Sequence, residues 1–371
     1  MNRLQRWRVG WIAGAVIVGL VLYHIRQSPE WRHFEWKQLV FLLLRVKTRL
    51  LALALVVTCS SYVIRAYRWR FFVDPIKRCS FPILFAGQVL GFSSIYLIGR
   101  AGEAVRPAYI ATKEHLPFVS QLAVLVLERI YDSFALVVLL ALTLDFVPVH
   151  ATSARSALLV QKAHTASAVI LILCGVLAVL LAVFRIYSEP LLHQIGRVLK
   201  IGPRILRTYL MHFLISFASG LKVIQNPRDF AASVGTTAVL WILNVTAVWL
   251  DLLSLGGRLA HTTWWAAGLV NFLAALGLIV QLPGVGGGYQ VAVLLALKDL
   301  LHIPAEAAAG AAILTYMTVM APCILLGIGI AIYEGITFRK LRVMAEAENE
   351  ALGLVPQAES VHQSPSSGMP A

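Results

Sequence analysis

A cluster of charged residues follows the apolar run 81–98, in the segment GRAGEAVRPAYI at residues 99–110. Two glycines and a proline interrupt the helical pattern there: Gly99, Gly102 and Pro107. Such residues let the backbone turn and expose its N–H groups, and broken helices are where membrane proteins build polar sites. The ionisable residues at this break are Arg100, Glu103 and Arg106. Glu103 can pair with one arginine and leave the other for an anion such as a phosphate; the alternative is an ordinary ion pair in a cytoplasmic loop.

A second charged segment, LERIYDS at residues 127–133, opens directly into the apolar run 134–147. Glu128 and Asp132 are four residues apart and share one helical face, whereas Arg129 is offset from both. Charges at the mouth of a membrane span are costly unless they face the bundle interior or water. Arg129 then neutralises a carboxylate across the bundle or joins the first segment, and the two carboxylates form a candidate acid–base pair. The alternative is that these side chains lie in the membrane interface and anchor the end of the helix.

A glycine-rich break also separates two apolar runs further along the chain, in QLPGVGGGYQ at residues 281–290. Its candidate site residues are Pro283, Gly284 and Gly287. Like the first break, it follows an apolar run and leads through a tyrosine into a small-residue helix that ends in a charged pair. Paired interruptions in the two halves of a membrane protein point to a transport site. With four spans between them, both breaks are expected to face the cytoplasm.

The glycine run at 283–288 does not predict nucleotide binding, because no Lys-Ser/Thr pair follows it and no strand precedes it. Asp251 lies near the end of the apolar run 232–254, where an interfacial position is favoured over a proton or headgroup site. Three arginines close to one end of the run 50–66 predict an anchor in the inner leaflet: Arg65, Arg68 and Arg70.

The composition sets the elements that must position these residues. The 371 residues are 59% hydrophobic and 13% charged, whereas a soluble domain carries about 25% charged residues. Runs long enough to span a membrane predict an all-α polytopic bundle with about eight spans plus re-entrant or broken helices. The net charge of +14 is spread between the apolar runs, which is typical of membrane topology and anionic headgroups and argues against a nucleic-acid partner. The four cysteines share no spacing that indicates a disulfide framework or a zinc site.

The chain is expected to form one transmembrane domain over residues 1–343, followed by a disordered tail at 344–371. The apolar run 9–24 follows three arginines without a cleavage site and predicts a retained first span. The basic, amphipathic region 185–228 is expected on the inner leaflet, either as an ordinary loop or as a lipid-headgroup site. Most Lys and Arg residues then fall on one side, which predicts that both termini are cytoplasmic in a cell inner membrane.

The three motifs at 99–110, 127–133 and 281–292 resemble the signatures of the lysylphosphatidylglycerol synthase transmembrane region family, whose members are also described as flippase-like proteins. The similarity runs from about residue 10 to residue 335. It implies a bundle of about eight spans with re-entrant segments that handles an anionic or modified phospholipid or another lipid-linked substrate. The positions that match are Gly99, Arg100, Gly102, Glu103, Arg106, Glu128, Arg129, Asp132, Pro283, Gly284 and Gly287.

Two departures from that family limit what the resemblance implies. The two-domain synthases append a soluble aminoacyl-transferase domain that this sequence lacks, so lysyl transfer is not expected. Many relatives also carry a charged residue after the second glycine motif, where this chain has Tyr289 and Gln290.

The leading hypothesis is translocation of a lipid whose phosphate is held by arginines that nearby carboxylates keep oriented. No ATPase motif, metal site or cofactor site is predicted, so movement would be downhill or coupled to protons or a partner. The alternatives are a membrane-embedded transferase for a lipid-linked substrate and a non-catalytic partner of a lipid-synthesis enzyme.

Overall fold

The computed structural model describes residues 34–146, 204–220, 227–278, 281–282 and 286–335, together with isolated positions between 165 and 197. The predicted span at 9–24 and the tail at 344–371 therefore lie outside the described residues, and the predicted span at 166–184 and the basic region 185–228 are only partly covered by them.

The described part of the chain is helical except for one pair of two-residue strands, which agrees with the predicted all-α class. The elements, in chain order, are α3 (Trp36–Leu44), α4 (Thr48–Val73), α5 (Phe81–Ile98), η1 (Gly99–Ala104), α6 (Val105–Glu114), α7 (Phe118–Phe146), α10 (Arg204–Gly220), α11 (Pro227–Leu255), η4 (Gly257–His261), α12 (Trp264–Gly277), β1 (Gln281–Leu282), β2 (Gly286–Gly287), α13 (Gly288–Leu295), η5 (Ala296–Leu300) and α14 (Ala305–Tyr333).

Four helices in this part are long and apolar enough to cross a membrane, namely α4, α5, α11 and α14. The chain is therefore a multi-pass helical membrane protein. Helix α7 has 29 residues, but the charged residues of the LERIYDS segment interrupt its apolar sequence. Since two of the expected spans lie outside the described residues, the total of about eight remains a prediction.

Helices α5 and α6 fold back on each other across η1, and we call residues 81–114 the first hairpin. Its two arms pack closely because glycines face the opposite arm: a Cβ on Gly91 would lie 2.6 Å from Cβ of Arg106, and a Cβ on Gly102 would overlap the backbone of Ser94. The base of the hairpin is closed where the backbone N–H of Ser80 donates to Glu114 Oε1 at 2.8 Å. The expected helix–break–helix is thus present, while its re-entrant course in the membrane stays a prediction.

Helices α12 and α13 form a second hairpin, residues 264–300, whose turn is the antiparallel pair β1–β2. A Cβ on Gly277 would lie 2.7 Å from the carbonyl carbon of Gly288, so this turn is also closed by close backbone approach. Near the base of this hairpin, Trp249 Nε1 of α11 donates to the carbonyl oxygen of Thr262 at 2.8 Å.

The two hairpins open toward opposite ends of the bundle. The base of the first hairpin lies beside the end of α14, where Tyr109 donates to Glu334 Oε1 at 3.0 Å. The base of the second lies at the other end, next to the end of α11 and the start of α14. Helices α12 and α13 pack on each other and return to the end of the bundle from which they start, whereas the expectation that both breaks face the cytoplasm stays a prediction.

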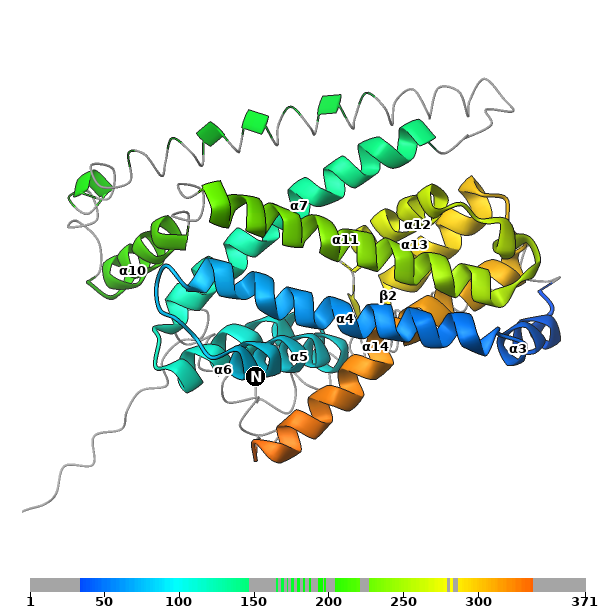
Figure 1. Ribbon diagram of the computed structural model, residues 1–371, viewed down its shortest axis with the longest axis horizontal. Helices are drawn as coiled ribbons and strands as arrows, with labels where there is room; N and C mark the ends of the chain where they lie inside the picture. Colours follow the sequence, from blue (N-terminus) through cyan, green and yellow to red (C-terminus); the bar gives the residue numbers. More distant parts are fainter. Residues whose placement is uncertain are drawn as a thin grey trace, which may run out of the picture.

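The turns of the two hairpins meet inside the bundle, where η1 contacts β1 (Figure 1). Aromatic rings join the tips to α14: Tyr316 lies 6.0 Å from Tyr96 of the first hairpin and 5.6 Å from Tyr289 of the second, measured between ring centroids. Helices α4 and α11 run lengthwise beside this junction and pack on each other. A polar site at this junction is surrounded by the two hairpins and by the long helices α4, α11 and α14.

Candidate functional site

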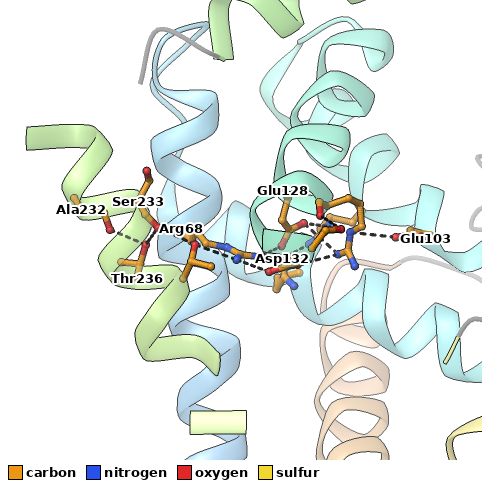
Figure 2. Close-up of polar contacts among 12 residues, drawn as sticks. Arg68, Glu103, Glu128, Asp132, Ala232, Ser233 and Thr236 are labelled. Carbon is orange, nitrogen blue, oxygen red and sulfur yellow. Dashed lines mark hydrogen bonds and ion pairs between the residues drawn. The ribbon is translucent and has the colours of Figure 1, made fainter. Parts of the chain in front are cut away.

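Charged side chains from four elements gather next to the first hairpin. We call them the charge cluster; its members are Arg65, Arg68, Glu103, Arg106, Glu128, Arg129 and Asp132. Arg68, Arg106, Glu128 and Asp132 are each at most 6% exposed. Figure 2 shows the carboxylates of Glu128 and Asp132 between Arg68 on one side and Glu103 on the other.

Arg68 of α4 is the most buried cation of the cluster, with no exposed surface. Its guanidinium donates to Asp132 Oδ1 at 2.6 Å, to Asp132 Oδ2 at 3.2 Å and to Glu128 Oε1 at 2.7 Å. It also donates to the hydroxyl of Thr237 on α11 at 3.3 Å. One side chain therefore ties α4, α7 and α11 together through charge-assisted hydrogen bonds, which are stronger than neutral ones.

Glu128 connects the two buried arginines. Its second oxygen, Oε2, accepts from Arg106 of α6 at 2.6 Å. Arg106 also donates to Gln88 Oε1 of α5 at 2.6 Å, and its guanidinium stands 4.1 Å from the ring centroid of Trp69. Arg106 thus fixes both arms of the first hairpin against α7 and α4, and the planar stacking on Trp69 is one that arginine makes and lysine does not.

Arg129 forms the open side of the cluster. Its side chain is 43% exposed, and it lies 3.6 Å from Glu103 Oε1, 3.4 Å from Glu128 Oε2 and 3.9 Å from Asp132 Oδ2. These distances are longer than those of the buried arginines, so Arg129 is held less tightly and can turn toward a ligand.

Arg65 lies one turn before Arg68 on α4 and is only partly buried. Its guanidinium stands 5.1 Å from the ring centroid of Phe92 and interacts electrostatically with Asp132 and Glu128. Among the residues that the structure describes, it forms no ion pair. Counting the described side chains alone, four arginines therefore face three carboxylates, which gives one positive charge in excess.

The structure brings together five of the residues predicted for the site: Glu103, Arg106, Glu128, Arg129 and Asp132. Gly99 supplies the positive φ of 75° with which α5 ends, and Gly102 packs in the turn. The backbone of Arg100 lies in η1, whereas its side chain is outside the description. Arg100 is therefore not placed relative to the cluster.

The second break is only partly described. Pro283 and Gly284 lie outside the described residues, and Gly287 has a positive φ of 90° where β2 leads into α13. The backbone N–H of Gly287 donates to Gln290 Oε1 at 2.7 Å, which fixes the start of that helix. This break reaches the first through the contact of β1 with η1.

Two of the alternatives and one expectation about these residues are wrong. Glu128 and Asp132 do not anchor a helix end in the interface, because they are 1% and 6% exposed and bound to buried arginines. The interpretation of the first break as an ordinary ion pair in a surface loop is wrong for Arg106, which is 4% exposed. Arg68 is no inner-leaflet anchor, while Arg70 fits that description better, with a side chain that is 44% exposed and paired with Asp74 at 3.5 Å.

Asp251 also differs from the expected interfacial position, since it is only 1% exposed. It lies one turn before the end of α11, but α14 runs past that end and covers it. Its carboxylate accepts a hydrogen bond from the hydroxyl of Thr318 on α14 at 3.0 Å.

Sequence reasoning missed Arg65, Arg68 and Gln88 as members or partners of the cluster. The signals were present: two arginines three residues apart share a helix face, and Gln88 is a polar residue inside an apolar run, where it needs a partner. The two arginines were assigned to an inner-leaflet anchor because arginines near the end of a span usually have that role.

The arrangement favours binding over proton transfer. Both oxygens of Glu128 accept from arginines, and both oxygens of Asp132 accept from Arg68. A general acid or base needs an oxygen that can reach the substrate proton. The carboxylates instead hold two arginines in place and leave Arg65 and Arg129 as the cations with capacity for an anion.

A family model described as the lysylphosphatidylglycerol synthase TM region matches residues 2–327. The matched range contains both hairpins and every member of the charge cluster. No curated protein matches the chain significantly.

Proposed function

The chain belongs to the lysylphosphatidylglycerol synthase transmembrane region family, and from this premise we propose that it moves a phospholipid with an anionic headgroup across the membrane. The acyl chains stay in the bilayer while the headgroup passes the charge cluster. The observation that carries the proposal is the excess positive charge of the charge cluster, in which the more accessible cations, Arg65 and Arg129, lie beside a buried network of ion pairs at the first hairpin.

The position of this excess charge, next to buried ion pairs inside a helical membrane protein, points to a substrate. An ion inside a membrane protein is costly unless it is paired, and unpaired charge at membrane depth marks substrate or ion pathways. A phosphate bears a compensating negative charge and accepts the bidentate hydrogen bonds that guanidinium groups donate. A phospholipid phosphate therefore supplies what the cluster lacks, and the hydrocarbon around the bundle accommodates its tails.

The residues have separate roles in this proposal. Arg65 and Arg129 bind the phosphate, because neither is held by two short ion pairs. Glu128 and Asp132 hold Arg68 and Arg106, which in turn keep the first hairpin in position. The opposed hairpins provide a barrier on each side of the headgroup, in the manner of interrupted helices in transporters.

The test is lipid translocation in liposomes that contain the purified protein and a trace of fluorescent phosphatidylglycerol. A membrane-impermeant quencher added outside reports the fraction of headgroups that become accessible over time. One charge-assisted hydrogen bond contributes about 1.5–3 kcal/mol, so Arg129→Gln should slow translocation at least about tenfold.

The matched control is Arg70→Gln, which removes an exposed arginine two residues beyond Arg68 and should leave the rate unchanged. Circular dichroism and gel filtration check that both variants fold. Translocation no faster than in empty liposomes, for phosphatidylglycerol and for other anionic lipids, would overturn the proposal; turnover of a sugar-phosphate lipid in the same vesicles would favour a transferase.

A further inference from the structure

Asp251 is a buried carboxylate that the charge cluster does not use. It lies on α11, is 1% exposed, and accepts one hydrogen bond, from Thr318 on α14 at 3.0 Å. Buried carboxylates in proteins are normally paired with a cation, as Glu128 and Asp132 are here. Within the described residues, no lysine, arginine or histidine forms an ion pair with Asp251.

The surroundings of Asp251 contain few ionisable groups. Tyr289 of α13 is the titratable side chain that interacts with it electrostatically. Thr318 from α14 and the hydroxyl of Ser254 on α11 itself are the other polar groups, and Ser254 donates to the backbone carbonyl of Asp251. At the same end of the bundle, the basic residues before and within α4 and within η4 form no ion pair with Asp251 in the part of the chain described; they are Lys47, Arg49, Arg258 and His261.

A chain of contacts leads from Asp251 to the tips of both hairpins. Thr318 lies three residues after Thr315 on α14, and Thr315 shares a hydrogen bond with Tyr289 at the tip of the second hairpin. Tyr289 packs on Tyr316, which packs on Tyr96 at the end of α5. A change of charge at Asp251 therefore acts on the place where the two hairpins meet.

We propose that Asp251 is a proton-binding site that couples proton movement to the opening of the hairpin junction, an inference that rests on the proposed lipid translocation. In the conformation described, the side chain is a carboxylic acid. When the junction opens to water on one side, the O–H bond of the acid breaks and the proton passes to that water; when the junction opens on the other side, the carboxylate takes a fresh proton from the water there and becomes neutral again. No electrons are transferred, and one proton is bound for each one released.

A proton fits this site better than a metal cation. A sodium or calcium ion takes several oxygen ligands, whereas the only side-chain hydroxyl within hydrogen-bonding distance of the Asp251 carboxylate is that of Thr318 in the part of the chain described. A protonated Asp251 needs only one such hydrogen-bond partner, because the bound proton makes the side chain neutral.

The first experiment detects the proton without any lipid transport. Infrared difference spectra of the purified protein, taken between neutral and alkaline pH, should show the C=O stretch of a protonated carboxylic acid. Asp251→Asn should lose this band, and Asp229→Asn, at the opposite end of the same helix, should keep it. Thr318→Val should shift the band by removing its hydrogen bond. A band that is the same in Asp251→Asn and in the native protein would overturn the proposal.

The second experiment measures coupling in the same liposomes used for translocation. A pH gradient of about two units should change the translocation rate several-fold in the native protein and in Asp229→Asn, but not in Asp251→Asn. A native rate that responds to a sodium gradient and not to pH would overturn the proposal. If no lipid is translocated at all, the proposed function fails while the infrared result still decides whether Asp251 binds a proton.

Discussion

Replacing Arg68 with methionine should be the most damaging single change in the described bundle. The guanidinium has no exposed surface and donates to both carboxylates of α7 at 2.6–3.2 Å. Methionine fills much of the same volume but, among the described side chains, leaves Asp132 only Arg129 as an ion-pair partner, at 3.9 Å. Breaking a buried pair by removing one partner costs about 3–5 kcal/mol.

The neighbouring Arg70 provides the matched control. Its ion pair with Asp74 is 3.5 Å long and 44% exposed on the arginine side, and exposed pairs contribute up to about 1 kcal/mol. Arg70→Met should therefore lower the free energy of unfolding by no more than about 1 kcal/mol. The two substitutions remove the same side chain from the same helix and differ only in burial and partners.

The assay is unfolding of the purified protein in mixed micelles of detergent and SDS, followed by far-ultraviolet circular dichroism. The double variant Arg68→Met with Asp132→Asn should recover part of the loss, because the uncompensated carboxylate is gone and Glu128 keeps Arg106. Direct couplings of this kind are about 0.5–3 kcal/mol. Equal losses in Arg68→Met and Arg70→Met, or strict additivity in the double variant, would refute the reasoning.

Three further predictions concern the hairpins. Gly102→Ala should destabilise the protein by about 1–3 kcal/mol, because its Cβ would overlap the backbone of Ser94, whereas Gly235→Ala on α11 meets nothing within 4 Å and should not; thermal unfolding of the two variants compares them. Arg106→Lys should slow translocation although the charge is kept, because the ammonium cannot both stack on Trp69 and bind two acceptors; the liposome assay measures this. Hydrogen bonding from Lys113, together with that from Tyr109, lowers the pKa of Glu334, so the stabilisation from this contact is complete at neutral pH and is lost as the pH falls below about 4; Glu334→Gln should reduce that acid sensitivity in a pH series of melting temperatures.

Local sequence signals predicted much of the first hairpin. Gly99 and Gly102 mark its turn, and Pro107, which was expected to interrupt the helical pattern, lies in the first turn of α6, where a proline is tolerated. The shared helix face of Glu128 and Asp132 followed from their spacing. These features are set by residues that are close by in the sequence, so they can be predicted from the sequence alone.

The partners across the bundle could not be predicted in the same way. Arg68 and Asp132 are 64 residues apart, and nothing in either neighbourhood indicates that α4 packs beside α7. The packing of α12 and α13 as a hairpin was not predicted for a similar reason: apolar length alone does not distinguish one crossing helix from half of a hairpin. Asp251 was assigned to the interface because it lies near the end of α11, whereas α14 covers it from outside that segment.

The central claim is that the charge cluster receives an anionic headgroup, and photo-crosslinking locates that headgroup directly. A phosphatidylglycerol analogue with a photoreactive group on the glycerol headgroup is irradiated in liposomes with the native protein, and the labelled peptides are identified by mass spectrometry. The account predicts labelling within residues 99–106 and 125–133 that falls at least about tenfold in Arg129→Gln and is unchanged in Arg70→Gln. Labelling confined to the outer surface of other helices, and equal in both variants, would contradict it.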